Sequence, residues 1–279
     1  MAGELYIVAT PIGNLGDMVP RAVDVLQMVD LVAAEDTRHS ARLLNHFAID
    51  TPMMAYHDYG DDRQMARIIA ALEQGKTVAL ISDAGTPLIS DPGYKLVREV
   101  RQLGFRIIPV PGACALIAAL SASGLPSDRF CFEGFLSHKS GARVKRLESL
   151  AAETATIVFY ESPHRILETL ADMSAVFGGE RQAVIARELT KTYETFLTGT
   201  LPGLLAEVQA DPNQQKGEIV ILLSGANNEQ TSEDSLEQER VLKLLMEEVP
   251  LKQAAKLAAK ITGGHKNALY QKALDIQTK

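Results

Sequence analysis

The predicted fold starts from one stretch of the sequence, Ser82-Asp83-Ala84-Gly85-Thr86-Pro87-Leu88-Ile89-Ser90-Asp91-Pro92-Gly93. Residues 76–81, just before it, contain an apolar run that is typical of a buried parallel strand. Residues 94–103, just after it, have the spacing of a helix. The loop therefore lies at the carboxyl end of a strand, where open α/β sheets bind their ligands. The alternative is an ordinary strand-to-helix connection made of turn residues.

Two further loops of this kind occur earlier in the chain. Residues 4–9 predict a strand that runs into Thr10-Pro11-Ile12-Gly13-Asn14-Leu15-Gly16-Asp17, whose glycines lack the spacing of a dinucleotide-binding fingerprint. Residues 30–34 predict another strand, which is followed by Glu35-Asp36-Thr37-Arg38-His39-Ser40. A helix cap needs only one of these polar side chains, so their gathering at a strand end favours a functional role over a capping role alone.

Strand and helix patterns alternate along the first part of the chain, which indicates βαβ units and a mostly parallel sheet. We assign this α/β domain to residues 1–112. A second α/β domain is predicted over residues 113–224. Its strands at 182–188 and 193–198 are too close for a crossover connection, so they predict an antiparallel hairpin and a mixed sheet.

The end of the chain is predicted to be helical. Residues 225–235 are polar and predict a linker. Residues 236–279 then form a helical tail unit, in which residues 251–276 have the pattern of a helix, a tight turn and a second helix. Such a helix-turn-helix-like unit either binds RNA or packs against the dimer, and the sequence leaves both readings open.

The composition excludes several classes of protein. The two cysteines, Cys114 and Cys131, lie among apolar neighbours, and no metal-ligand spacing occurs, so we expect no metal. The longest apolar run, residues 113–120, is too short to cross a bilayer, and the start of the chain lacks the pattern of a signal peptide. We therefore expect a cytoplasmic protein with no membrane partner.

Basic residues are concentrated in two places on an acidic chain. The whole chain carries a net charge of −7, but residues 251–279 contain six lysines and one aspartate and carry +5. A second cluster consists of Lys139, Arg143, Lys145 and Arg146. Local basic patches on an acidic body are typical of a protein that binds phosphate groups at chosen points, although the second cluster is equally compatible with an ordinary solvated face.

The loops described above carry a family resemblance. The motifs T-P-I-G-N-L-x-D, A-E-D-T-R and S-D-A-G-T-P-x-I-S-D-P-G occur in this order, and further matches lie at residues 111–115, 134–136, 160–165, 186–191 and 216–218. Over nearly its whole length the chain resembles the tetrapyrrole methylase superfamily, the class III S-adenosylmethionine methyltransferases. Within that superfamily it is most similar to members that methylate ribosomal RNA of the small subunit.

The resemblance implies a fold, a cofactor and an assembly. The fold is two α/β domains with a cofactor cleft between them, followed by the small helical unit. The cofactor is S-adenosylmethionine, and the assembly is a homodimer. The matching positions imply that cofactor is bound by Thr10, Pro11, Asp83, Ala84, Gly85, Ser90, Asp91, Ala113, Tyr160, Lys216, Gly217 and Glu218. Tyr160 is equally compatible with a half-buried strand position.

The implied acceptor is the ribose 2′-hydroxyl of a cytidine in 16S ribosomal RNA or the small ribosomal subunit. That hydroxyl is a poor nucleophile, so alignment and proton removal matter. The candidate catalytic residues are Glu35, Asp36, Arg38, Glu188 and Lys191, with His57 as a further candidate base. We favour Asp36 as the base or as the group that orients the hydroxyl, with Arg38 and Arg187 on a phosphate or on the flanking ribose. The candidate RNA contacts are Lys139, Arg143, Arg187, Lys256 and Lys266.

Two other functions remain as alternatives at this point. One is a methylase of a tetrapyrrole or another small acceptor on the same fold. The other is a non-catalytic ribosome-assembly factor that has kept the cofactor pocket. The lysine-rich tail and the cluster around Lys139 speak against a small acceptor, because such an acceptor needs neither.

Overall fold

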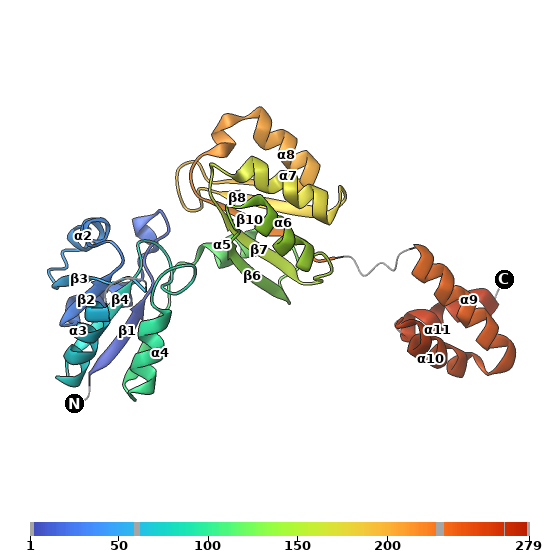
Figure 1. The fold of residues 1–279 in the computed structure, drawn as a ribbon, viewed down its shortest axis with the longest axis horizontal. Coiled ribbons are helices and arrows are strands. Elements are labelled where there is room, and N and C mark those ends of the chain that lie inside the picture. Colours follow the sequence, from blue (N-terminus) through green and yellow to red (C-terminus); the bar gives the residue numbers. More distant parts are fainter. Residues whose placement is uncertain (1–2, 59–61, 227–231, 265, 278–279) are drawn as a thin grey trace. The chain divides into compact units, whose positions relative to one another are not determined.

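The computed structural model describes residues 3–58, 62–226, 232–264 and 266–277 (Figure 1). The chain divides into two compact units, residues 1–226 and residues 227–279. The larger unit contains two five-stranded sheets, and the smaller one is helical. These elements confirm the predicted class, which is two α/β sheets with helices and a C-terminal helical unit.

The first sheet is parallel throughout, as its alternating pattern predicted, and has the strand order β3-β2-β4-β1-β5. Its strands are β1 Glu4–Val8, β2 Leu31–Ala34, β3 Met53–Ala55, β4 Thr77–Ile81 and β5 Arg106–Val110. Its helices are η1 Leu15–Asp17, α1 Pro20–Met28, α2 Thr37–His46, α3 Asp62–Glu73 and α4 Tyr94–Gln102. Side chains of α1 and α2 share one buried cluster with the sheet, and those of α3 and α4 share another. The two faces of the sheet are therefore both covered, which explains the continuous apolar strands.

The second sheet is mixed and has the order β6-β7-β10-β8-β9. Its strands are β6 Phe130–Phe135, β7 Thr156–Glu161, β8 Gln182–Arg187, β9 Thr195–Thr200 and β10 Ile219–Leu223. Its helices are α5 Ala115–Ala122, α6 Ser140–Ser149, α7 Ile166–Phe177, α8 Leu201–Ala210 and η2 Pro212–Gln215. Strands β6 and β7 are parallel, and the other neighbours are antiparallel, including the predicted β8–β9 hairpin.

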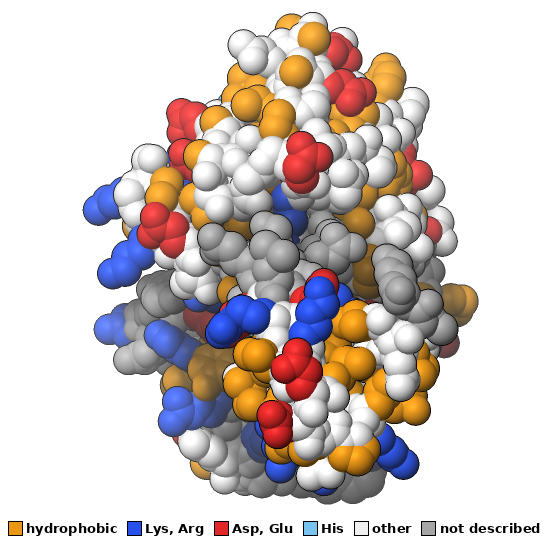
Figure 2. Space-filling model, turned by 90° about the vertical axis from the view of Figure 1, so that its right-hand side faces the viewer, with side chains coloured by type: hydrophobic (Ala, Val, Ile, Leu, Met, Phe, Trp, Pro, Cys, Tyr) orange, Lys and Arg blue, Asp and Glu red, His pale blue; other side chains and the backbone are white. Residues whose placement is uncertain are grey.

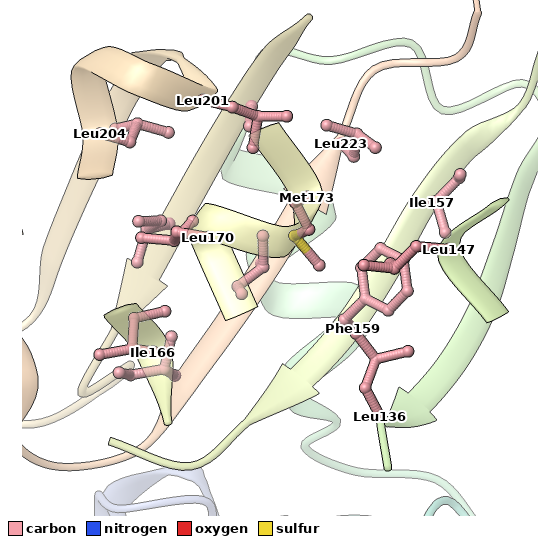
Figure 3. Packing of buried hydrophobic residues seen from close by; sticks show 14 of the residues in the cluster. Leu136, Leu147, Ile157, Phe159, Ile166, Leu170, Met173, Leu201, Leu204 and Leu223 are labelled. Atoms are coloured by element: carbon pink, nitrogen blue, oxygen red, sulfur yellow. The ribbon is translucent and has the colours of Figure 1, made fainter. Parts of the chain in front are cut away.

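The two faces of this second sheet pack against different parts of the chain. One face is covered by α6, α7 and α8, with Phe159, Leu170 and Met173 at the centre of a buried cluster (Figure 3). On the other face, α5 packs together with Ile12 and Ile89. Those two residues belong to loops of the first sheet, so the loops that the sequence singled out contact the second sheet directly.

The interior of the second sheet's helical layer contradicts one prediction. Arg143 on α6, expected to contact RNA, is only 1% exposed. Its guanidinium lies 2.6 Å from the carboxylate of Asp172 and 3.4 Å from that of Glu168, both on α7. The sequence could not show this, because Arg143 occupies the buried face of α6 while its basic neighbours Lys139 and Lys145 are exposed. Arg143 joins two helices and is not an RNA contact.

The C-terminal unit consists of α9 Ser232–Glu248, α10 Leu251–Thr262 and α11 Lys266–Gln277. Helix α9 begins inside the stretch predicted as a linker, of which residues 227–231 lie outside the described residues. Gly263 ends α10 in the left-handed conformation at φ +73°, as a tight turn between two helices requires. Small residues such as Ala254, Ala255 and Ala258 let the three helices pack closely around Leu242 and Leu269.

The lysines of α10 lie opposite its buried alanines. Lys252, Lys256 and Lys260 follow one another at intervals of four residues, so they share one face of the helix, and all three are exposed. Lys266 at the start of α11 is exposed as well. Basic side chains stand beside hydrophobic ones on the face of the molecule seen in Figure 2. None of the helices in the described ranges has the length and apolar character needed to span a bilayer.

Candidate active site

The three loops predicted from the sequence meet at the carboxyl edge of the first sheet. Thr10 and Gly85 form an isolated backbone bridge, with N–H to C=O distances of 2.8 and 3.1 Å. The Thr10 hydroxyl donates to the carbonyl of Ser82 at 3.3 Å. The N–H of Asp36 donates to the carboxylate of Asp83 at 3.0 Å. Each loop is therefore fastened to the loop at residues 82–93, which forms the centre of this edge.

A cleft of about 330 Å³ opens beside this edge and is lined by loops of both sheets. Its volume falls within the range of small-molecule sites in proteins. The lining residues are Ile12, Ala84, Gly85, Thr86, Ile89, Ser90, Asp91, Cys114, Ala115, Phe135, Tyr160, Glu161, Ser162, Pro163, Leu189, Gly217, Glu218, Ile219 and Val220. Most of them are apolar, so the cleft suits a ligand with a large uncharged part and a few polar groups.

Seven of the twelve predicted cofactor residues line this cleft, namely Ala84, Gly85, Ser90, Asp91, Tyr160, Gly217 and Glu218. The other five are not part of the lining: Thr10, Pro11, Asp83, Ala113 and Lys216. Several of these five hold the lining in place. The Ala113 carbonyl accepts a hydrogen bond from the hydroxyl of Thr86 at 3.0 Å, and the Lys216 carbonyl accepts one from Arg187 at 3.4 Å.

Glycine is required at two points of the lining. Gly85 has φ +81° and Gly217 has φ +80°, both in the left-handed region that other residues rarely adopt. A Cβ atom on Gly217 would also overlap the carboxylate of Glu188. Two residues in the central loop are strained in the same way without being glycine, Leu88 at φ +74° and Ser90 at φ +65°. Such strain is concentrated at ligand sites, because the surrounding structure must hold it in place.

The charge of the lining favours a cationic ligand. The lining residues include three acids and neither lysine nor arginine. Glu161 is paired with Arg165 at 2.7 Å, and Glu218 with Lys191 at 3.0 Å. The third acid, Asp91, has a raised pKa of about 6, chiefly because it is buried. A hydrogen bond from Ser82 opposes this shift, and the neighbouring carboxylates add to it. A bound positive charge would relieve this unfavourable burial.

Tyr160 takes part in the site from the second sheet. Its hydroxyl accepts a hydrogen bond from the N–H of Leu116, at the start of α5, at 3.1 Å. Its ring makes edge contacts with Phe132 and Phe135, with centroid distances of 4.8 and 5.6 Å. Burial raises the pKa of Tyr160 well above its ordinary value, so its hydroxyl stays protonated. Tyr160 thus holds α5 and β6 together at the wall of the cleft.

Comparison with known proteins identifies the family to which the chain belongs. The model of the tetrapyrrole (corrin/porphyrin) methylases matches residues 4–205, nearly three quarters of the chain. The chain belongs to the tetrapyrrole methylase family. A second family model, the RsmI C-terminal HTH domain, matches residues 232–277 of this tetrapyrrole methylase.

Two full-length relatives of this methylase bear the same name, "Ribosomal RNA small subunit methyltransferase I". The protein from Pseudomonas aeruginosa is 58% identical, covering 100% of this chain and 99% of its own length. The protein from Escherichia coli O157:H7 is 53% identical, covering 99% and 96%. A uroporphyrin-III C-methyl transferase from Thermus thermophilus, solved with S-adenosyl homocysteine, shares the fold with a TM-score of 0.55 at 17% identity, covering 79% of this chain and 97% of its own.

The cofactor of this tetrapyrrole methylase is S-adenosylmethionine, as the sequence predicted. The residues present fit that group. Gly85 and Gly217 would allow main chain to approach it, the apolar lining would suit its adenosine, and Asp91 would supply a negative charge for its sulfonium or ammonium group. Among the described residues, no group of histidine, cysteine or acidic side chains is arranged to hold a metal ion.

The predicted catalytic acids of the methylase differ from each other in environment. Asp36 caps helix α2, accepting hydrogen bonds from the N–H groups of Arg38 at 2.8 Å and His39 at 3.4 Å. These bonds lower the pKa of Asp36. Glu35 is half-buried, and burial together with the charge of Asp83 raises its pKa. Of the two neighbours, Glu35 is therefore the stronger base and Asp36 the weaker one.

Two of the remaining candidates, Glu188 and Lys191, form an ion-pair cluster with Glu218, which lines the cleft. Lys191 lies 2.9 Å from Glu188 and 3.0 Å from Glu218. Burial opposes both charges, but the hydrogen bonds outweigh it, so the pKa of Glu188 is lowered and that of Lys191 is raised. Neither side chain is therefore a strong base near neutral pH. The lysine stem also lies against Gly13, where a Cβ would come within 2.5 Å of it, so the cluster contacts the first loop.

Arg187 was predicted to contact RNA, and the structure contradicts this. Arg187 is 8% exposed. Its guanidinium donates to the side chains of Gln214 and Thr195 and to the carbonyls of Tyr193 and Lys216, at 3.1 to 3.4 Å. All three nitrogens of its guanidinium therefore donate to β9 or to the segments next to β9 and η2. Arg38, by contrast, is 94% exposed and remains available to a partner.

Several lining residues were missed by the sequence analysis. Ile12, Phe135 and Leu189 are apolar residues after strands, and although all three lie in motifs that carried the family resemblance, an apolar residue there can belong to a cleft wall or to a core. Ser162 and Pro163 lie in a motif that carried the family resemblance, so that motif was a signal for them. Phe135 also lies in such a motif, but its direction depends on a local irregularity of β6.

Proposed function

We propose that this tetrapyrrole methylase transfers the methyl group of S-adenosylmethionine to the ribose 2′-hydroxyl of a cytidine in 16S ribosomal RNA. The observation that carries the proposal is the pair of relatives above, which match the chain over almost its entire length and are named for ribosomal RNA of the small subunit. The exposed lysine face of α10 supports it, because a macromolecular phosphate backbone is the partner that such a face fits. A tetrapyrrole acceptor would leave this face without a role.

The cofactor brings an electrophilic methyl group, so the chain's own residues have to align the hydroxyl and take up its proton. We assign the proton acceptor to Glu35 in place of Asp36. The raised pKa of Glu35 makes its carboxylate a better base, while the carboxylate of Asp36 is engaged in capping α2. Arg38, exposed at the same edge, is assigned to a phosphate of the RNA.

The RNA contacts that remain after the two corrections are Lys139, Lys256 and Lys266, all of them exposed. We propose further that the enzyme is cytoplasmic and works as a homodimer. The domain division at residues 1–112, 113–224 and 236–279 belongs to the same proposal. It follows the two sheets and the helical unit, although the polypeptide of both sheets forms one compact unit of contacts.

The test uses labelled S-adenosylmethionine with three acceptors: small ribosomal subunits that lack the modification, the 16S RNA extracted from them, and uroporphyrinogen III. Transfer to the 2′-hydroxyl of a cytidine in either RNA sample supports the proposal. Transfer only to the tetrapyrrole, or to none of the three, contradicts it.

The assignment of the base is tested by two matched variants. Glu35→Gln should lower the single-turnover rate with saturating RNA by about 10²-fold or more, because the amide cannot take a proton. Asp36→Asn keeps a capping oxygen, so it should stay within about threefold of the wild-type rate. The opposite order of the two rates would return the role of base to Asp36.

A further inference from the structure

One residue of the cleft has no role in cofactor binding or proton transfer so far. Phe135, the last residue of β6, lines the cleft and is nevertheless 57% exposed. Single exposed apolar side chains are common on protein surfaces and need no explanation by themselves. Phe135 differs because its ring stands at the entrance of the site where methyl transfer takes place.

A β-bulge aims this ring into the cleft. Phe132 pairs with Val158 on β7, but the next pair is Gly134 with Phe159, so Glu133 is an extra residue in β6. Side chains of a regular strand alternate between its two faces. If β6 alternated regularly through Glu133, Phe132 and Leu136 would face the cleft and Phe135 would face the helical core.

The observed directions are the reverse of that alternation. Phe135 contacts the ring of Tyr160 on the cleft side, at a centroid distance of 5.6 Å. Leu136 points into the helical core with Leu147 and Phe159 (Figure 3). Gly134 makes the reversal possible with φ +65°, and its bare Cα lies against the hydroxyl of Ser90, which a Cβ would approach to 3.1 Å. Bulges that redirect a side chain in this way are frequent beside active sites.

Basic and imidazole residues follow the ring closely along the chain and in the neighbouring loop. His138 and Lys139 follow it in the loop after β6, and His164 lies in the loop after β7; all three are exposed. The two loops are fastened together by the guanidinium of Arg165, which donates to the carbonyl of Leu136 at 3.0 Å. An exposed aromatic ring with hydrogen-bond donors and positive charge beside it is the arrangement on which proteins stack unpaired nucleic-acid bases.

We propose that Phe135 is a stacking platform for an unpaired base of the RNA, the base of the methylated nucleotide or of its neighbour. The proposal rests on the function proposed above and names the contact that brings the ribose to the cofactor cleft. The ring stacks on the base, while His138, Lys139 and His164 hold the adjoining phosphates. A ribose in a continuous base-paired helix has neighbours on both sides, so a base that has left its stack gives the 2′-hydroxyl access to a recessed site.

The basic residues beside Phe135 in the chain argue for this occupant over the adenine of the cofactor. Adenine is uncharged and needs no cation beside it. Phosphates of RNA match both the charge and the donors.

The test compares Phe135→Ala and Phe135→Tyr with Phe130→Ala as a matched control. Phe130 lies on the same strand and is 42% exposed but does not line the cleft. Transfer to unmodified small ribosomal subunits is measured over a range of subunit concentrations, S-adenosylmethionine affinity by calorimetry, and oligomeric state by light scattering. Loss of a base-stacking ring weakens nucleic-acid binding by roughly 5- to 150-fold, so Phe135→Ala should raise the apparent KM for subunits at least about fivefold.

The expected pattern separates the proposal from its rivals. Because Phe135 also lines the cofactor cleft, Phe135→Ala should weaken cofactor binding by a smaller factor than it raises the KM for subunits, and it should leave the oligomeric state unchanged. Phe135→Tyr should restore most of the RNA affinity, and Phe130→Ala should behave as wild type. An unchanged KM in Phe135→Ala would overturn the proposal. So would an equal loss of cofactor affinity, or a shift to a smaller oligomer. If the wild-type enzyme itself methylates no RNA, the proposed function has failed, and the two failures are thereby distinguished.

Discussion

Acidification should weaken the binding of S-adenosylmethionine, and Asp91 should be the cause. Burial raises the pKa of Asp91 to about 6. The cofactor carries a sulfonium and an ammonium charge, so it should bind the form of the cleft in which Asp91 is ionised. Below pH 6 the carboxyl is protonated, and a proton has to leave before this pairing forms.

The magnitude follows from the pKa. At pH 5 about a tenth of the Asp91 carboxyls are ionised, and at pH 8 nearly all of them are. The apparent Kd should therefore be about tenfold larger at pH 5 than at pH 8, which is a difference of about 1.4 kcal/mol. Asp91→Asn should remove this dependence and bind about 10- to 100-fold more weakly at pH 8, since a hydrogen bond to a charged group contributes about 1.5–3 kcal/mol.

Isothermal titration calorimetry between pH 5 and pH 8 measures both quantities. Glu35→Gln is the matched control, because Glu35 also has a raised pKa and its charge contributes to the shift of Asp91. That variant should keep the pH dependence, with its midpoint moved to lower pH. A wild-type Kd that stays constant between pH 5 and pH 8 would refute the pairing of Asp91 with the cofactor's charge. So would an Asp91→Asn variant that retains the wild-type pH profile.

Asp91→Asn should also raise the thermal midpoint near pH 7.5 and by much less near pH 4, because a carboxyl whose folded-state pKa is raised to about 6 loses its stabilising contribution between its unfolded pKa of about 4 and pH 6. Equal shifts at both pH values would argue against burial as the cause. Gly85→Val should weaken cofactor binding at least about tenfold in calorimetry, since valine is strained at φ +81° and its Cβ would lie 3.3 Å from Ile12. Wild-type affinity in a folded variant would show that this loop only connects a strand to a helix. Arg143→Ala should lower the urea-derived free energy of unfolding by about 3 kcal/mol because it leaves Asp172 without its buried partner, and a primary loss of RNA affinity instead would restore the surface role. Replacing Lys256 and Lys266 by alanine should reduce the steepness with which the logarithm of the RNA association constant falls with the logarithm of the salt concentration, by about 1.5 to 2. Cofactor affinity should not change. An unchanged slope would assign these lysines to packing.

Much of the fold was predictable because its signals are local. The apolar strands, the loops rich in glycine and proline, and the hairpin at β8 and β9 depend on neighbouring residues, and the structure confirms them. The family motifs also placed Gly85, Asp91 and Gly217 correctly at the cleft. This was possible because the position of each of these residues is set by the backbone of its own loop.

Roles that depend on distant partners were not predictable in the same way. Arg143 and Lys139 look alike in a basic cluster, but only packing against α7 shows that Arg143 is buried. Arg187 is engaged by residues up to 29 positions away. Asp36 and Glu35 are adjacent acids whose pKa values move in opposite directions, because one accepts backbone hydrogen bonds and the other is buried near Asp83.

The sequence by itself determined the two α/β sheets, the helical unit, the family and the loops that form the site, because these follow from periodicity and from turn residues read in order along the chain. The tertiary structure alone decided which charged side chains are engaged by other residues of the protein and which remain exposed to a partner. Burial and pairing depend on residues that are far apart in the sequence. It also decided where Phe135 points. One extra residue in β6 reverses the alternation of its side chains, and only the register with β7 reveals that reversal.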